Sequence, residues 1–223
     1  MKSVPKNLPQ NAGASSADAG HWRVYLLCSL WLTIEWIVVY GGANWITGLH
    51  DYRVDLHTAL DSQIPFVPAA AIIYLSLFPL LWSSALVLHT PQQIRSFARA
   101  IAILFALSGL GFLIVPARQL YEVPSGPSTN GLAFQLADWI NLTYNSIPSL
   151  HVGMAVVCAY FYSRLTPQMA AVGWWAWAMA IALSTLLTHQ HYIVDVATGG
   201  ALGFIVAVSA KSRRIDVGFR HQD

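Results

Sequence analysis

The chain has 223 residues, of which 56% are hydrophobic and only 10% are charged, whereas a soluble globular domain carries about 25% charged residues. Together with a mean hydropathy of +0.51, these values exclude a disordered chain, a collagen-like chain and an ordinary soluble enzyme. They indicate a single membrane domain that crosses the bilayer several times. A net charge of +2 gives no reason to expect a nucleic-acid partner.

The beginning of the chain is polar and is predicted to be a disordered cytoplasmic tail over residues 1–22. It is rich in Ala, Ser, Gly and Pro and has no apolar centre, which is not the pattern of a cleavable signal peptide. Residues 23–210 are predicted to form the membrane domain, and 211–223 a basic cytoplasmic tail. The two cysteines, Cys28 and Cys158, lie in apolar runs and are interpreted as small core residues.

Six apolar runs are candidates for membrane spans, because a helix needs about 20 residues to cross the hydrocarbon core. The last three are separated by short polar turns, and their flanks are rich in Tyr and Trp, as at a bilayer interface. The fold class predicted is therefore all-α, a polytopic bundle of six transmembrane helices. The six runs are 24–46, 66–88, 97–115, 147–162, 169–187 and 192–210.

Charge placement predicts the orientation of this bundle. With the N-terminus in the cytoplasm, ten of the 12 Lys and Arg residues fall in cytoplasmic segments, and only Arg53 and Arg118 fall outside. This arrangement satisfies the positive-inside rule, so both termini are predicted to be cytoplasmic. The short loops suit a bacterial inner membrane.

Two outer segments are polar or long. Residues 48–65 carry several charges, and 116–146 is longer than most connections, which is typical of functional or disordered segments. Its second half places Leu132, Leu136, Trp139 and Tyr144 on one helical face. This pattern fits a helix on the membrane surface or a helix packed within the loop.

Polar residues collect at one level in the last three spans. They are expensive inside a membrane, so they are candidates for function. All of them fall at the outer end of the predicted topology, so three separate pieces of sequence converge there. The polar residues are Pro148, Ser149 and His151 in the fourth run, Ser184, Thr185 and Thr188 in the fifth, and His189, His191 and Asp195 in the sixth.

The local chemistry of these pieces suits phosphoryl transfer. A capped helix start at Pro148, with free amides and the Ser149 hydroxyl, is an anion site, and His151 lies on the same turn. His191 and Asp195 are four residues apart on a predicted helix face. The carboxylate can hold one imidazole nitrogen protonated and leave the other as nucleophile or base.

The order of these motifs resembles the type 2 phosphatidic acid phosphatase superfamily of membrane phosphatases and phosphotransferases, over residues 61–204. The Pro-Ser-Gly-His motif of this family is similar to Pro148-Ser149-Leu150-His151. The family also has a Ser-Arg motif followed by His-x-x-x-Asp, which is similar to Ser184-Thr185 followed by His191…Asp195. The resemblance implies that His191 is the nucleophile that forms a phosphohistidine, Asp195 its orienting partner and His151 the general acid. Ser149 and Ser184 would bind phosphate. The resemblance also implies six spans and no metal; no other cofactor is predicted.

Three positions depart from the family pattern. Leu150 replaces a glycine but keeps its backbone amide for phosphate, and Thr185 replaces an arginine and so removes a cation. The first family motif is absent, and Arg118 after Pro116 is its nearest remnant, able to make a bidentate contact to phosphate. The string 188–195, and Asp61 with 64–65, look like the branch that contains inositol phosphorylceramide synthases. Fewer cations suggest a less charged substrate, such as a phosphodiester.

The function predicted is hydrolysis or transfer of a lipid phosphate at the outer, periplasmic face of the membrane. The bilayer and a lipid phosphate are the expected partners, and no oligomeric state is predicted. Alternatives are a transferase that moves a phospho-headgroup between lipids, and a catalytically dead family member. A metal hydrolase would use His151, His189, His191 and Asp195 as ligands, and a transporter would use the mid-span Glu35.

Overall fold

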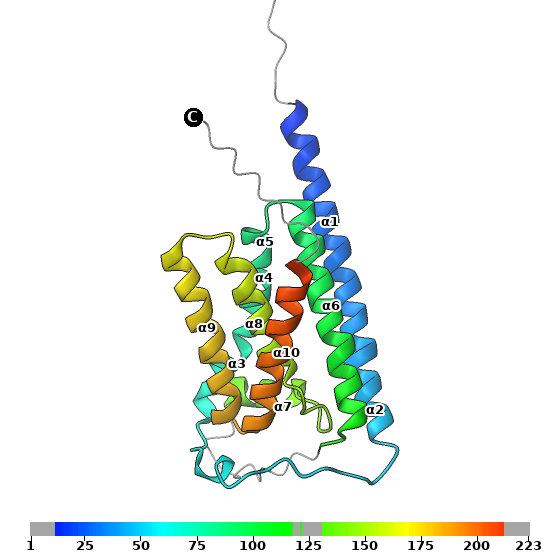
Figure 1. Cartoon of the computed structure of the whole chain (residues 1–223), viewed down its shortest axis with the longest axis vertical. Helices are drawn as coiled ribbons and strands as arrows, with labels where there is room; N and C mark the ends of the chain where they lie inside the picture. The colour runs from blue at the N-terminus through cyan, green and yellow to red at the C-terminus, as the bar shows by residue number, and fades with distance from the viewer. Residues whose placement is uncertain (1–11, 118–120, 122–130, 212–223) are drawn as a thin grey trace, which may run out of the picture.

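The protein is described by a computed structural model that covers residues 12–117, 121 and 131–211, with side chains described from residue 20 to residue 210 within those ranges. The described part is helical and contains no strand, apart from one isolated bridge between Val54 and Ala117. The helices run side by side as an elongated bundle (Figure 1). The all-α prediction is confirmed.

The first segment is one long rod. It consists of α1 (Ala12–Trp36), the π-helical turn η1 (Ile37–Gly41) and α2 (Gly42–Thr47). The helix begins earlier than expected, inside the range 1–22 that was predicted to be disordered. Residues 12–19 are mostly Ala, Ser and Gly, and the alanines, with their high helix propensity, allow the helix to extend to Ala12.

The second predicted span is broken rather than continuous. After a single 3₁₀ turn, η3 (Pro68–Ala70), it runs through α3 (Ala71–Leu75), α4 (Leu77–Trp82) and α5 (Ser84–Val87). The interruptions fall at Ser76 and Ser83, whose hydroxyls donate to the backbone carbonyls of Ile73 and Pro79. Such back-bonding bends helices.

The third segment is α6 (Pro91–Ile114), which starts earlier than the predicted 97. Thr90 and Gln93 form a reciprocal capping box in front of it, a strong signal for a helix start. In the outer loop that follows, α7 (Leu132–Ile140) confirms the expected short helix. Leu132 and Trp139 on this helix are about 80% exposed, as expected for a helix that rests on a membrane surface.

The last three helices form the centre of the bundle. They are α8 (Leu150–Ser163), α9 (Gln168–Leu187) and α10 (Ile193–Lys211). The helix α8 begins three residues later than the predicted run, because Ser149 has an extended backbone and caps it. Nearly every residue of α8 is buried, so this helix forms the core around which the others pack.

Glycines let α8 and α10 approach closely. A methyl group added at Gly199 would lie 2.3 Å from the carbonyl oxygen of Ser149, and one added at Gly203 would lie 2.5 Å from that of Gly153. These two glycines of α10 are four residues apart, a spacing typical of tight helix pairs in membranes. The close approach fixes the start of α8 against the first turns of α10.

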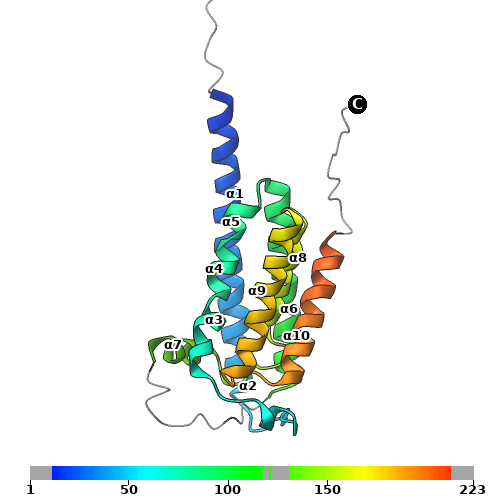
Figure 2. The ribbon, with the colours of Figure 1, turned by 90° about the vertical axis from the view of Figure 1, so that its left-hand side faces the viewer.

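Within the described residues, five helical segments are long and apolar enough to cross a membrane: Gly20–Thr47, Pro68–Val87, Pro91–Ile114, Gln168–Leu187 and Ile193–Ala210. The sixth, α8, is apolar but has only 14 residues. The start of α1 and the end of α10 lie at the same end of the bundle, while α2 and α7 lie at the other (Figures 1 and 2). The arrangement and composition of these helices are those of a membrane protein. The orientation of the bundle in the membrane remains a prediction.

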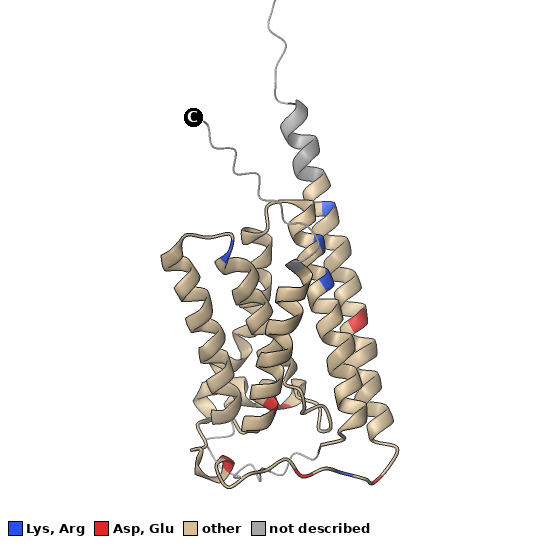
Figure 3. Ribbon diagram, in the orientation of Figure 1, with Lys and Arg blue, Asp and Glu red and all other residues tan. Residues whose placement is uncertain are grey.

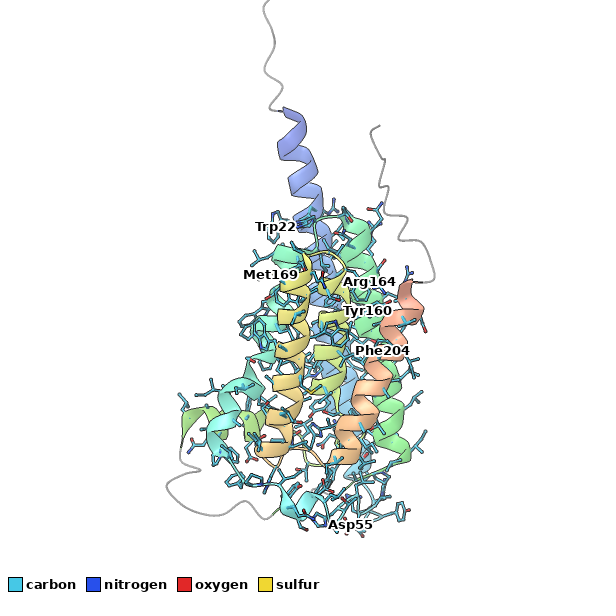
Figure 4. All side chains as sticks on the ribbon, turned by 60° about the vertical axis from the view of Figure 1, so that its left-hand side comes forward. Trp22, Asp55, Tyr160, Arg164, Met169 and Phe204 are labelled. Atoms are coloured by element: carbon cyan, nitrogen blue, oxygen red, sulfur yellow. The ribbon has the colours of Figure 1, made fainter. Side chains whose placement is uncertain are left out.

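The charged residues are separated along the bundle. Lys and Arg cluster near the end where α1 starts, whereas most Asp and Glu lie at the end of α2 and α7 (Figure 3). Figure 4 shows Trp22, Arg164 and Met169 toward one end of the bundle and Asp55 at the opposite end. This separation agrees with the predicted positive-inside topology.

Candidate functional site

Two segments that are far apart in sequence meet at the start of α8 and the start of α10. The Ser149 amide donates to the backbone carbonyl of Asp195 (3.0 Å). This bond ties the two helix starts together at the end of the bundle that carries α7. The polar residues that the sequence placed at one level are therefore adjacent in space.

His191 lies in the turn that leads into α10. The prediction that it shares a helix face with Asp195 is wrong, because α10 begins only at Ile193. The Asp195 side chain folds back instead: its Oδ2 accepts the Tyr192 amide (2.9 Å) and lies 3.4 Å from His191 Nδ1. The carboxylate thus caps the helix and orients the imidazole at the same time.

The other nitrogen of His191, Nε2, has no hydrogen-bond partner. Nε2 of His191 and Oδ1 of Asp195 are both buried and make no hydrogen bond. A buried polar atom without a partner is costly, so this Nε2 is an atom that a ligand or substrate can engage. With Nδ1 held by the carboxylate, Nε2 keeps its lone pair.

His151 faces His191 from the first turn of α8. The two ring centroids are 6.1 Å apart, a separation that lets a group placed between the rings contact both. The His151 ring stacks on Tyr74 of α3 at 4.3 Å, and its Nδ1 lies 3.3 Å from the Tyr74 hydroxyl. This leaves Nε2 of His151 for proton transfer.

The serines and threonines of the site make local bonds. The Ser149 hydroxyl accepts the Val152 amide as a helix cap, so the amides of Leu150 and His151 are those with no intrahelical acceptor. The Ser184 and Thr185 hydroxyls donate to the carbonyls one turn back in α9. Their roles as phosphate ligands, like those of Ser149 and Leu150, stay predictions.

The Thr185 backbone carbonyl shapes the turn that carries His191. Its carbonyl accepts the amides of both Gln190 (3.0 Å) and His191 (3.2 Å). These bonds fold the turn between α9 and α10 back onto the end of α9. They hold the backbone of His191 next to the end of α9.

Asp61 holds the same turn from the opposite side. It is fully buried in the short 3₁₀ helix η2 (Asp61–Gln63). Its Oδ1 accepts the Ile193 amide, and its Oδ2 accepts the amide and the hydroxyl of Thr58. Burial raises the pKa of Asp61, but these hydrogen bonds and the nearby His57 outweigh it, so the pKa of Asp61 is lowered.

His189 belongs to the wall of the site. It has a left-handed backbone with a φ of 57°. Its Nε2 lies 3.1 Å from the Ile64 carbonyl, and its ring stacks on Tyr121 at 4.0 Å. The metal-hydrolase alternative needs His189 as a ligand, and no group of three or more potential ligand side chains lies together in the described ranges.

Arg118, the predicted phosphate cation, lies outside the described residues. The described arginine at this end is Arg53, whose guanidinium donates to the carbonyls of His50 (2.6 Å) and Tyr52 (2.7 Å) and lies over the Tyr144 ring. It is thus committed to its own loop. Among the described residues, the contacts of the His151 and His191 rings involve no arginine or lysine.

Comparison with known proteins decides the family. Residues 49–209 match the family model described as the PAP2 superfamily, which covers all of the site residues above. The chain belongs to the PAP2 superfamily. The superfamily resemblance predicted from the motif order is confirmed; the activity of the protein and its branch within the superfamily are left to the proposal below.

One relative of this PAP2-superfamily chain is an uncharacterized protein of Methanocaldococcus jannaschii. The two are 32% identical over 129 residues, which is 55% of this chain and 52% of the relative. The match thus spans about half the length of the relative. Because that protein is uncharacterized, the similarity carries no information on the substrate.

Sequence reasoning missed Tyr74 and gave Asp61 no structural role. Tyr74 lies in an apolar run with nothing to mark it, and its contact with His151 joins positions 77 residues apart. Asp61 entered only through the branch resemblance, although a carboxylate in a loop before a span is itself unusual enough to suggest a capping role.

Proposed function

We propose that this PAP2-superfamily protein is a membrane enzyme that removes or transfers the phosphate group of a lipid through a phosphohistidine on His191. The observation that carries the proposal is the pair of facing histidines. His191 offers a buried Nε2 without a partner, and its other nitrogen lies against Asp195. His151 faces it across 6.1 Å.

The first step needs both rings. Nε2 of His191 attacks the phosphorus, the bond from phosphorus to the lipid oxygen breaks, and that oxygen takes a proton from His151. Asp195 stabilises the imidazolium character that develops on His191. In the second step His151 accepts a proton from water or an alcohol, whose oxygen attacks phosphorus and releases His191.

The acceptor distinguishes a phosphatase from a headgroup transferase. Thr185 stands where the family pattern has an arginine, and among the described residues no Arg or Lys contact to His151 or His191 occurs. Both observations favour a substrate with low negative charge, such as a lipid phosphodiester, and so support the branch that contains inositol phosphorylceramide synthases. We place the site at the periplasmic face of a bacterial inner membrane. The separation of basic and acidic residues along the bundle supports this placement.

The test uses purified protein in detergent with excess chelator and a panel of lipid monoesters, pyrophosphates and diesters, with and without an alcohol acceptor. We expect release of phosphate or headgroup that resists the chelator and is lost in His191→Ala. His151→Ala should lower the rate about 10²- to 10⁴-fold. Activity that survives in His191→Ala would contradict the mechanism, and preference for monoesters over diesters would contradict the branch assignment.

A further inference from the structure

A second feature adjoins the site: an apolar cavity of about 320 Å³ between α1, α4, α6 and α8. His151 and Leu150 form its inner end, next to the candidate site. Tyr25, Cys28 and Ser84 lie at the other end. No Asp, Glu, Lys or Arg occurs among the described residues that line it.

The cavity runs along the bundle. Its lining on the first segment extends from Tyr25 of α1 to Tyr40 of η1, which is about 22 Å at the rise of an α-helix. One leaflet of the hydrocarbon core is about 15 Å thick. The cavity is therefore long, narrow and apolar, as a hydrocarbon chain requires, rather than compact, as a polar headgroup requires.

The cavity is open toward the bilayer between α1 and α4. Trp82 and Thr33 both line it and both are exposed, Trp82 at 68%. At the end far from His151 the two walls are joined by a hydrogen bond between the Tyr25 hydroxyl and Ser84 Oγ (3.2 Å). A chain can thus enter sideways, and the Tyr25–Ser84 pair closes the far end.

We propose that this cavity holds the hydrocarbon chain of the lipid substrate and that the residues at its far end, Tyr25, Cys28 and Ser84, set the chain length that the enzyme accepts. The inference rests on the proposed function. The proposal is based on the fact that the cavity adjoins the candidate site, because His151 belongs both to the facing histidine pair and to the cavity lining. A phosphate at His151 therefore places the attached chain at the cavity entrance.

The first experiment shortens the cavity. Cys28→Phe fills the far end, and Leu30→Phe is the matched control, because Leu30 is on the same helix, 58% exposed and outside the cavity lining. Product release is measured on alkyl phosphates and on alkyl phosphodiesters, each with chains from octyl to octadecyl. We expect Cys28→Phe to keep activity on the octyl substrates and to lose at least about tenfold on the octadecyl substrates, the effect of about two methylenes that can no longer be buried.

Leu30→Phe should keep the chain-length profile of the wild type. The same profile in Cys28→Phe would overturn the proposal. Because activity on the octyl substrates reports folding and catalysis in each variant, a misfolded protein is recognised by loss on every chain length. In that case the second experiment decides.

The second experiment measures binding without turnover. A hexadecyl phosphate with a diazirine on its terminal carbon is photolysed with the His191→Ala variant, and the labelled peptides are mapped. We expect label on residues 25–29 or 84–98, and displacement of the label by unmodified hexadecyl phosphate. Label confined to residues that line no part of the cavity would overturn the proposal.

The two readouts separate failure of the chain site from failure of the proposed function. Label in the cavity without any phosphate release would sustain the chain site and reject the phosphatase. Release without label in the cavity would do the reverse. Equal labelling by a hexadecyltrimethylammonium probe that carries the same diazirine would show a pocket for any bilayer lipid, and would overturn the assignment to substrate.

Discussion

At the scale of single residues, Asp195 makes contacts that affect both the chemistry of the site and its local structure. One oxygen of its carboxylate caps α10 through the Tyr192 amide and contacts His191, while the backbone carbonyl of the same residue accepts the Ser149 amide. Helix start, nucleophile orientation and contact with α8 therefore depend on one position. A substitution of Asp195 can disturb the chemistry, the local structure or both. A useful substitution must therefore change one of these and keep the other.

The substitution Asp195→Asn separates the chemical role of this side chain from its structural role. The asparagine oxygen can still accept the Tyr192 amide, so the turn is retained, but a neutral amide cannot stabilise a charged His191 ring. We expect the catalytic rate to fall about 100-fold or more, with a change in unfolding free energy of about 1 kcal/mol. Enzyme assays and thermal unfolding in detergent measure the two effects.

The matched control is Asp55→Asn, an exposed carboxylate whose Oδ1 accepts the His57 amide in the outer loop. It should leave both rate and stability near wild type. If Asp195→Asn retained most of the activity, the carboxylate would be only a helix cap and the orienting role would be withdrawn.

At the scale of elements, the contact of α8 with α10 positions the site. A methyl group at Gly199 would lie 2.3 Å from Ser149 O and 2.9 Å from Ser149 N. Gly199→Ala must therefore push the start of α8 away from Asp195. We expect a strong loss of activity and a destabilisation of about 1–3 kcal/mol, the usual cost of overpacking.

Gly200→Ala is the control for this prediction. Its added methyl group would meet only Val152 Cγ1 at 3.7 Å, an ordinary van der Waals contact. Helix propensity changes in the same way in both variants, so the difference between them isolates the clash. Equal activity in the two variants would mean that the spacing of the helix starts does not control the site.

Elements are also where prediction from sequence succeeds and fails. The apolar runs identified α6, α9 and α10 because bilayer thickness fixes their length. The breaks at Ser76 and Ser83 were missed, because the sequence does not indicate whether a serine hydroxyl bonds back to its own helix. His191 was placed inside a helix because the four-residue spacing to Asp195 fits a helix and also fits a capping turn.

The sequence predicted those site residues that can be recognised by residue type and by local spacing. His151, His191 and Asp195 were identified from residue types, order and resemblance, and the structure brings them together. Tyr74 and the Asp61 bond to the start of α10 were not identified, since they join positions 77 and 132 residues apart. Contacts of this kind depend on how the helices pack, which no local pattern encodes.

At the scale of the whole molecule, the separation of charge predicts the orientation in the membrane. Asp55 and Arg164 lie at opposite ends of the bundle (Figure 4), and the candidate site lies at the Asp55 end. The positive-inside rule predicts that the Arg164 end lies in the cytoplasm. In that orientation the site would face outward, where a substrate from the outer leaflet could reach it.

Cysteine substitutions at these two positions test the orientation in intact cells. We expect Asp55→Cys to react with a membrane-impermeant maleimide without permeabilisation, and Arg164→Cys to react only after it. The wild-type chain is the control for Cys28 and Cys158, one partly and one fully buried. The reverse pattern would place the facing histidines in the cytoplasm, and the substrate would then have to be a lipid presented from the inner leaflet.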